Sequence, residues 1–180
     1  MSKKRRQNYV IAGLVILIIV AGYTIYVTYI KPVTITVTPP VRAKQMVTLY
    51  FYNPGTDTLK PEQREIIRAA TLTGTCREIM AGLEQGSSTG LTTPVPAGVS
   101  VNNAQLQSDG TLLLDVNKAL VTGTPEGSSA EITALYSIVN SMAKNITGVN
   151  AVQITIDGKL LQTLETHIEI DQPLVPDYTK

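Results

Sequence analysis

An uncharged, apolar run near the start of the chain restricts its architecture more than any other sequence feature. Residues Val10 to Ile30 carry no charge and consist mainly of Ile, Val, Leu, Ala and Gly. As a helix, at about 1.5 Å per residue, this run is roughly 31 Å long, which matches the hydrocarbon core of a bilayer at about 30 Å. The run therefore predicts a transmembrane helix over residues 10–30.

The flanks of the run predict its orientation. A basic cluster, Lys3 to Arg6, precedes it without any acidic residue, and Tyr9 and Tyr29 lie near its two ends, where aromatic rings favour the headgroup level. The apolar part of a cleaved signal peptide is usually shorter and ends in a small-residue site, and neither an Ala-x-Ala site nor a cysteine for lipid attachment follows here. We expect an uncleaved single-pass anchor with residues 1–9 in the cytoplasm and the remainder outside.

Composition excludes several classes of protein. The chain has 15 basic and 14 acidic residues, and because four of the basic ones precede the apolar run, the remainder is acidic and has no general attraction for nucleic acid. One cysteine cannot form an intramolecular disulfide, and with one histidine it cannot complete the four-ligand cage of a structural zinc site.

The rest of the chain divides into three parts. Residues 31–44 alternate β-branched residues with Thr and contain three prolines, which predicts an extended, semi-rigid stalk. Residues 45–170 form one folded domain, and residues 171–180, with Pro173 and Pro176, are expected to be a flexible tail.

Periodicity predicts the elements of the domain. Strands are expected over 46–52, 99–106, 112–116 and 149–156, with a last edge strand within 161–170. Helices are expected from Leu72 to Leu83 and from Ser128, where Glu131 completes a capping-box spacing, to Ile146. The segment Glu62 to Ala69 fits either a backward extension of the first helix or a hairpin partner of the first strand. This order predicts an α+β fold, with a single mixed or antiparallel sheet and two helices on one face.

The residues that could carry chemistry have simpler structural interpretations. His167 lies in an alternating segment and is expected to face solvent, whereas Cys76 shares an apolar helical face, where a thiol acts as a small hydrophobe. Asp109 and Asp157 precede glycines in predicted turns, and Asp115, at the end of a buried strand, is expected to form a structural clasp near Ser128 or Ser129. We therefore predict no catalytic, cofactor-binding or metal-binding residue, no cofactor and no enzymatic activity.

Several segments in order resemble the GerMN domain. They are Val47–Tyr52, Leu59 with Pro61-Glu62 and Arg64, Gly82–Gly86, Pro96 with Gly98-Val99, Asp109-Gly110 to Asp115, Ser128-Ser129 to Asn140, and Val149 to Gly158. The resemblance covers residues 46–160. It departs from the family in having one copy instead of a tandem pair and a transmembrane segment instead of a lipid-modified cysteine.

The resemblance implies more than the residues do. The family occurs in bacterial sporulation and spore germination proteins and in envelope lipoproteins, and it is similar in fold to the ring-building modules of secretion-like assemblies. It favours the hairpin for Glu62 to Ala69 and supplies no catalytic residues. It also implies that the membrane is the bacterial cytoplasmic membrane.

Three functions are compatible with these observations. We expect a membrane-anchored, extracytoplasmic binding module that docks protein partners in sporulation or germination. The alternatives are a receptor for peptidoglycan ligands, or an accessory subunit of a cell-wall hydrolase or the hydrolase itself. The sequence leaves the partner and the oligomeric state open.

Overall fold

The computed structural model describes residues 3–30, 43–125, 128–164 and 168–180. The chain divides into two compact units, residues 1–40 and 41–180. Most of the predicted stalk and the predicted strand residue His167 lie outside the described residues.

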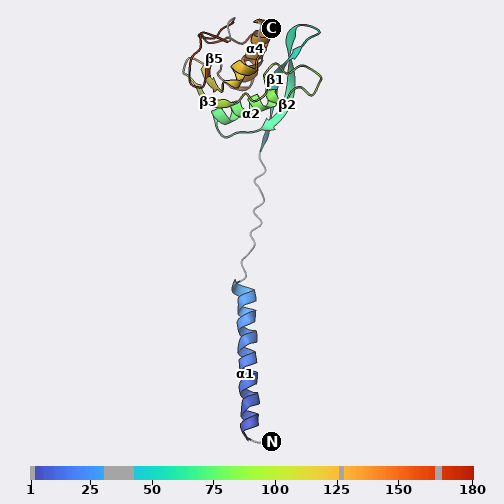
Figure 1. Cartoon of the computed structure of the whole chain (residues 1–180), viewed down its shortest axis with the longest axis vertical. Coiled ribbons are helices and arrows are strands. Elements are labelled where there is room, and N and C mark those ends of the chain that lie inside the picture. Colours follow the sequence, from blue (N-terminus) through green and yellow to red (C-terminus); the bar gives the residue numbers. More distant parts are fainter. Residues whose placement is uncertain (1–2, 31–42, 126–127, 165–167) are drawn as a thin grey trace. The chain divides into compact units, whose positions relative to one another are not determined.

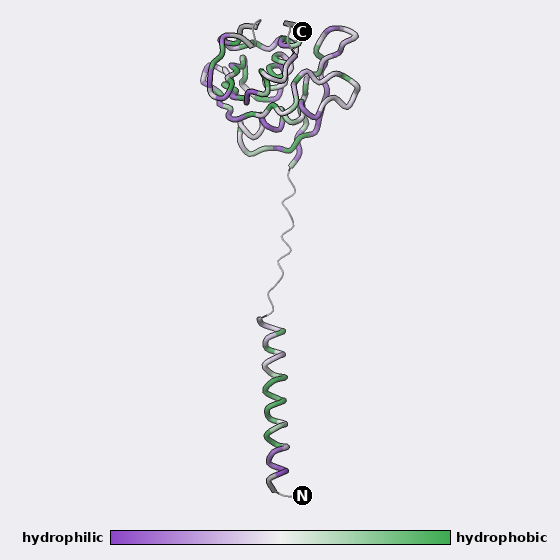
Figure 2. The backbone as a smooth tube through the Cα atoms, viewed as in Figure 1, coloured by the Kyte–Doolittle hydropathy of each residue, from purple (hydrophilic) through white to green (hydrophobic). Residues whose placement is uncertain are grey.

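The first unit is a helix, α1 (Lys3–Ile25), continued by a short π-helical turn, η1 (Tyr26–Ile30). Residues Arg5–Tyr29 are long and apolar enough to cross a membrane, a property that a signal sequence shares. Figure 2 shows hydrophilic residues at the start of α1 and hydrophobic residues along its middle. The predicted apolar helix is thus present.

The second unit is an α+β domain (Figure 1). Its elements in chain order are β1 (Lys44–Asn53), β2 (Thr58–Ile67), α2 (Leu72–Glu84), β3 (Val101–Leu106), β4 (Thr111–Val116), α3 (Ala119–Gly123), α4 (Ser128–Asn145), β5 (Ala151–Ile156), β6 (Thr163–Leu164) and β7 (Ile168–Glu169). The α+β class, both long helices and the four main strands are confirmed. The short helix α3 was not expected, and the last predicted strand is replaced by the two-residue strands β6 and β7, which pair with each other.

Local chemistry explains where these elements begin and end. β2 pairs antiparallel with β1, which confirms the hairpin alternative for Glu62 to Ala69. Thr71 caps α2, since its hydroxyl accepts a hydrogen bond from the Gly74 N–H at 3.1 Å. Gly110, with φ of 85°, makes the turn between β3 and β4. α4 begins at Ser128 as expected, but the Ser128 side chain is not described, so the capping box stays a prediction.

The core is formed by apolar faces of the two long helices and of the central strands. Its largest fully buried side chains include those of Leu49, Phe51, Ile79, Met80, Leu83, Leu112, Leu114, Leu135, Ile138, Met142 and Ile154. Burying one such side chain contributes about 1.5–3 kcal/mol. These positions repeat with periods of two in the strands and about 3.6 in the helices, which is the pattern that the sequence displays.

The strands form three ladders instead of the single expected sheet: β1–β2, the mixed ladder β3–β4–β5, and β6–β7. The free edge of β1 is occupied by side chains of α4. The Asn145 amide accepts from the Thr48 N–H at 2.8 Å and donates to the Thr48 oxygen at 2.7 Å. Ser141 Oγ accepts from the Tyr50 N–H at 3.0 Å, and Ser137 Oγ donates to the Tyr50 oxygen at 2.6 Å.

Helix α2 covers the free edge of β3 in the same way. Thr73 Oγ1 bonds both the N–H and the oxygen of Ala104 at 3.2 Å, and Arg77 donates to the oxygens of Val101 and Asn102 at 2.8 and 2.7 Å. Four helical residues rise about 6.0 Å and two strand residues about 6.6 Å, so Asn145 and Ser141, four apart on α4, reach the alternate residues Thr48 and Tyr50 of β1. The free edges of β1 and β3 are therefore satisfied by side chains of helices.

The segment 171–180 also differs from the expected flexible tail. Leu174 exchanges two main-chain hydrogen bonds of 2.9 Å with Val152 at the free edge of β5. The fully buried Asn140 side chain donates to the Asp177 oxygen at 2.7 Å and accepts from its N–H at 2.9 Å. Main-chain pairing of this kind does not depend on apolar periodicity, which the segment lacks.

Candidate functional site

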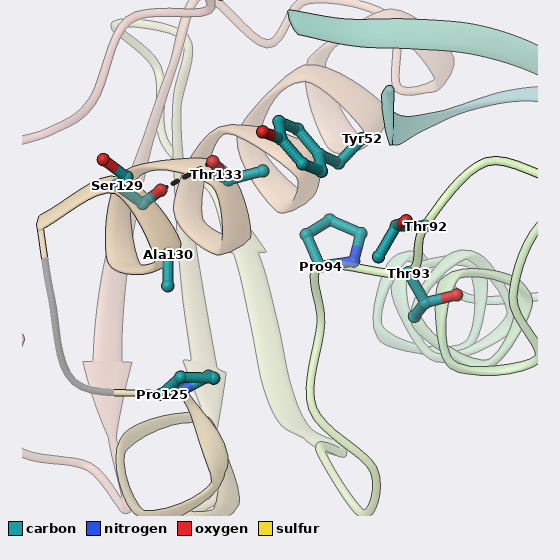
Figure 3. A pocket seen from close by; sticks show the side chains of 8 residues that line it. All are labelled: Tyr52, Thr92, Thr93, Pro94, Pro125, Ser129, Ala130 and Thr133. Carbon is teal, nitrogen blue, oxygen red and sulfur yellow. Dashed lines mark hydrogen bonds between the residues drawn. The ribbon is translucent and has the colours of Figure 1, made fainter. Parts of the chain in front are cut away.

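A groove lies along the first turns of α4. Its larger part is a hollow of about 320 Å³, lined by Tyr52, Thr92, Thr93, Pro94, Pro125, Ser129, Ala130 and Thr133. In Figure 3 the Thr133 side chain and the Tyr52 ring lie toward Pro94, with Thr92 and Thr93 beside it, while Ala130 points toward Pro125 at the other end. Proline rings, an aromatic ring and threonine methyl groups give this surface an apolar character, with hydroxyl groups for directional contacts.

A second hollow of about 210 Å³ continues the groove and shares Tyr52, Ser129 and Thr133 with the first. Its other lining residues are Asp57, Thr58, Leu59, Ile132 and Lys180. The groove therefore has an uncharged part and a part with one carboxylate and one ammonium group. We call the two hollows together the α4 groove.

The β1–β2 hairpin and the loop after α2 position the walls of the α4 groove. Tyr52 and Thr92 exchange main-chain hydrogen bonds of 2.9 and 2.8 Å, which joins the loop to the end of β1. The Tyr52 hydroxyl donates to Asp57 Oδ1 at 2.8 Å. This hydrogen bond, together with partial burial, raises the pKa of the Tyr52 phenol, so the group stays protonated and the ring stays oriented.

A buried carboxylate fixes the start of the same loop. Glu62 Oε1 accepts from Arg64 at 2.8 Å and from the Ser88 N–H and hydroxyl at 3.0 and 2.8 Å. Glu62 Oε2 accepts from the hydroxyls of Ser87 at 2.6 Å and Thr89 at 2.8 Å. Burial alone would raise the pKa of the Glu62 carboxyl, but these donors outweigh it and hold the pKa well below its usual range.

Arg64 extends this cluster, because the same Nη1 that bonds Glu62 donates to the Gly86 oxygen at 2.8 Å. We call Glu62, Arg64, Ser87, Ser88 and Thr89 the Glu62 cluster. All of its donors belong to the loop that leads to Thr92 and Pro94 or to β2 itself. The Glu62 cluster is therefore a structural clasp that holds one wall of the α4 groove in place.

Two of the three aspartates that the sequence analysis names, Asp109 and Asp157, act in turns. Asp109 Oδ1 accepts from the Thr111 N–H at 2.8 Å in the β3–β4 turn, and Asp157, with φ of 48°, occupies the turn after β5. Asp115 does form a clasp, but with Thr155 Oγ1 and the Gly158 N–H at 2.8 and 2.7 Å instead of Ser128 or Ser129. The reason is that β5 runs parallel to β4 and places Thr155 opposite Asp115.

Cys76 is fully buried in the core, and burial raises the pKa of its thiol to about 12, which disfavours the reactive thiolate. His167, the one histidine of the chain, lies outside the described residues. Among the residues that the structure describes, no group of three His, Cys, Asp or Glu side chains is placed to hold a metal ion.

Sequence reasoning missed both the α4 groove and the Glu62 cluster. The groove combines residues from β1, the loop after α2 and α4, which no local pattern links. The Glu62 cluster did leave a signal: Ser87, Ser88 and Thr89 follow the glycine that ends α2, and three consecutive hydroxyl residues are natural partners for a buried carboxylate. That signal becomes specific only once Glu62 is placed beside them.

The sequence profile of one protein family, Germane, described as sporulation and spore germination, matches residues 48–162. The chain belongs to this family. The match includes most of β1, and β2, α2, the ladder β3–β4–β5 and α4 in full, and it confirms the GerMN resemblance. No curated protein matches this chain in sequence.

Solved GerMN structures share the fold. The tandem GerMN domains of the sporulation protein GerM from Bacillus subtilis match with a TM-score of 0.56 at 15% identity, covering 77% of this chain and 46% of the tandem. The first GerMN domain of that protein matches with a TM-score of 0.55 at 17% identity, covering 73% of this chain and 97% of that domain. The chain thus spans about half of the tandem structure, and this Germane-family chain has the GerMN fold.

Proposed function

We propose that this Germane-family chain is a membrane-anchored, extracytoplasmic and non-catalytic module that binds a protein partner in the bacterial envelope during sporulation or germination. The α4 groove is the docking site. Its rings, methyl groups and hydroxyls suit a short apolar peptide segment, and Asp57 with Lys180 suits a polar end of that segment.

The observation that carries the proposal is the set of hydrogen bonds that the polar side chains around the groove make. Glu62 is a buried carboxylate that holds the loop forming one groove wall, and five hydrogen-bond donors occupy its two oxygens. A carboxylate held so far below its usual pKa is a poor general acid or base near neutral pH. The groove itself presents a recognition surface of fixed shape, which favours binding over catalysis.

The apolar helix α1 supports the anchoring part of the proposal. Its basic start and its length suit an anchor with the domain outside. Alkaline phosphatase fused after Lys180 in bacteria tests this, because that enzyme is active only outside the cytoplasm. We expect the fusion protein to be enzymatically active and to remain in the membrane fraction after carbonate washing. Activity released into the soluble fraction would identify a cleaved leader instead.

Photo-crosslinking in sporulating cells tests the docking site. A photoreactive residue at Thr133 or Pro94, in the α4 groove, should capture the same protein, whereas one at the exposed Asn102 on β3 serves as the matched control and should not capture it. Capture at Asn102 alone contradicts the proposal. The proposal is also contradicted if neither groove position captures a protein and a deletion strain sporulates and germinates normally. Co-sedimentation of the purified chain with protein-free sacculi would instead support a receptor for peptidoglycan ligands.

A further inference from the structure

The smaller hollow of the α4 groove, which we call the charged hollow, has two charged residues in its lining, Asp57 and Lys180. The Lys180 ammonium already has a partner, because its Nζ lies 5.7 Å from the centre of the Tyr136 ring. Tyr136 lines neither hollow of the groove. The charge that the charged hollow presents to a ligand is therefore that of the Asp57 carboxylate.

One oxygen of the Asp57 carboxylate is held and the other is open. The Tyr52 hydroxyl donates to Oδ1 at 2.8 Å, which fixes the direction of the carboxylate. Within the described part of the chain, no hydrogen bond or ion pair reaches Oδ2. Because Asp57 is exposed, Oδ2 is accessible to a group that enters the charged hollow.

The turn between β1 and β2 does not by itself require a charge at Asp57. This residue has a φ of 52°, in the left-handed region, where a side chain costs about 1–2 kcal/mol. Glycine would avoid that cost. Asparagine adopts this conformation as readily as aspartate does, and its oxygen would still accept from the Tyr52 hydroxyl. The geometry of the turn therefore explains a short side chain with an oxygen, and the negative charge needs a further reason.

Hydroxyl groups around the charged hollow direct their protons into the domain. The Tyr52 proton goes to Asp57, and Thr133 Oγ1 donates to the Ser129 oxygen at 2.6 Å, the hydrogen bond drawn in Figure 3. Both hydroxyls therefore offer lone pairs to a ligand, as Asp57 Oδ2 does. A ligand group that fits among three acceptors has to supply donors.

We propose that the charged hollow binds a basic side chain of the partner, an arginine or a lysine, while neighbouring apolar residues of the partner occupy the larger hollow. Ammonium and guanidinium groups carry several donors and no acceptor, and their positive charge complements Asp57. A guanidinium also stacks on an aromatic ring such as that of Tyr52. The inference rests on the α4 groove being the docking site, as proposed above, and adds the chemistry of the ligand.

Peptide selection on the full chain in detergent tests this inference. The probe is a phage-displayed library of random short peptides, and the selected peptides should share a basic residue at a fixed distance from apolar residues. Selection on Asp57→Asn should retain the apolar residues and lose the basic one. Asp109→Asn is the matched control, because Asp109 is also an exposed turn aspartate that accepts one hydrogen bond, and the basic residue should persist in its peptides.

Binding of one selected peptide measures the contact with Asp57. The basic residue is replaced by a neutral isostere, citrulline for arginine or acetyl-lysine for lysine. This replacement should weaken binding to the unchanged chain about tenfold, since it removes a charge-assisted hydrogen bond. It should change binding to Asp57→Asn very little, because the two changes remove the same contact. A merely structural role of Asp57 would not produce this coupling.

The outcomes separate this inference from the docking site on which it rests. Thr133→Trp fills the groove and should abolish binding of the selected peptides. If it does so, but the peptides lack a basic residue or keep it on Asp57→Asn, this inference is overturned and the docking site stands. An isostere penalty of equal size on Asp57→Asn also overturns it.

The docking site and this inference are overturned together if no peptide is selected, or if Thr133→Trp leaves binding unchanged. Urea midpoints close to that of the unchanged chain establish that Asp57→Asn and Thr133→Trp are folded.

Discussion

The side-chain amide of Asn145 pairs with both main-chain polar groups of Thr48, 97 residues earlier, as a neighbouring strand would. The same Nδ2 also donates to the Ser141 oxygen at 2.7 Å. Asn145 begins the sequence Asn-Ile-Thr, which fits a glycosylation acceptor. A glycan on this nitrogen would break the contact with β1, so the structural role of Asn145 explains the residue better.

Asn145→Ala should lower the free energy of unfolding by about 1–3 kcal/mol, because it leaves partly buried main-chain groups of Thr48 without partners. Pulse proteolysis in increasing urea measures this on the detergent-solubilised chain. Asn102→Ala is the control, since its one side-chain hydrogen bond is long, at 3.4 Å, and exposed. Equal urea midpoints for the two variants would show that α4 does not stabilise the β1 edge.

Glu62 should make stability depend on acidity. Its folded-state pKa lies below the unfolded value, so its contribution is complete above about pH 4.3 and declines as the pH falls toward the folded pKa. Glu62→Gln should lower the free energy of unfolding by about 2 kcal/mol at neutral pH. Below a pH of about 4.3, the variant should lose less stability on further acidification than the unchanged chain does.

Urea unfolding of the Glu62→Gln chain at several pH values checks this. Glu65→Gln is the control, because Glu65 pairs with Lys44 on the surface, where both side chains are more than half exposed. Its effect should stay below about 1 kcal/mol. An acid profile for Glu62→Gln that parallels the unchanged chain would contradict the assigned role.

A comparison of Gly110 with Gly90 separates two energetic costs of replacing glycine: backbone strain at a positive φ, and steric contact of the added Cβ. Their φ angles are 85° and 84°, so both substitutions by Ala incur a left-handed strain of about 1–2 kcal/mol. A Cβ at Gly110 would also meet the Asn150 amide and the Gly148 oxygen, the latter at 2.9 Å, whereas no atom lies within 4 Å at Gly90.

Gly110→Ala should therefore lower the urea midpoint clearly more than Gly90→Ala does. The difference measures the close approach of the β3–β4 turn to the segment before β5. Identical midpoints would mean that this approach carries no strain.

Cys76 should be inert in the folded chain. Burial and a thiol pKa of about 12 leave little thiolate at pH 8. A chromogenic disulfide reagent should react only after urea unfolds the domain, with a rate that follows the unfolded fraction. Rapid labelling without denaturant would show that the α2 face opens easily.

Much of this fold follows from local patterns. Leu72, Cys76, Ile79 and Leu83 lie on one helical face in the sequence and are in or against the core in the structure. Turn chemistry located the hairpin at Asp109-Gly110, because aspartate and glycine tolerate the required φ angles. The GerMN resemblance then favoured the hairpin of β1 and β2, which periodicity left open and the structure confirms.

The site was much less predictable. Ser137 and Ser141 have no local feature that distinguishes them from solvent-facing helix residues, yet both are fully buried against Tyr50. Tyr52 and Pro94 meet only because Thr92 joins the end of β1. The partners of a polar side chain are set by contacts between distant segments, which composition and spacing do not encode.

The sequence by itself determined the apolar helix, the two amphipathic helices, the hairpins and the family, because each depends on spacing along the chain or on a local turn. Only the tertiary structure decided that helices α2 and α4 take the places of neighbouring strands, that Glu62 fixes a groove wall, and that the segment 171–180 is docked. The physical reason is that a buried polar group must find a partner wherever the fold places one, and for Thr48 that partner lies 97 residues away.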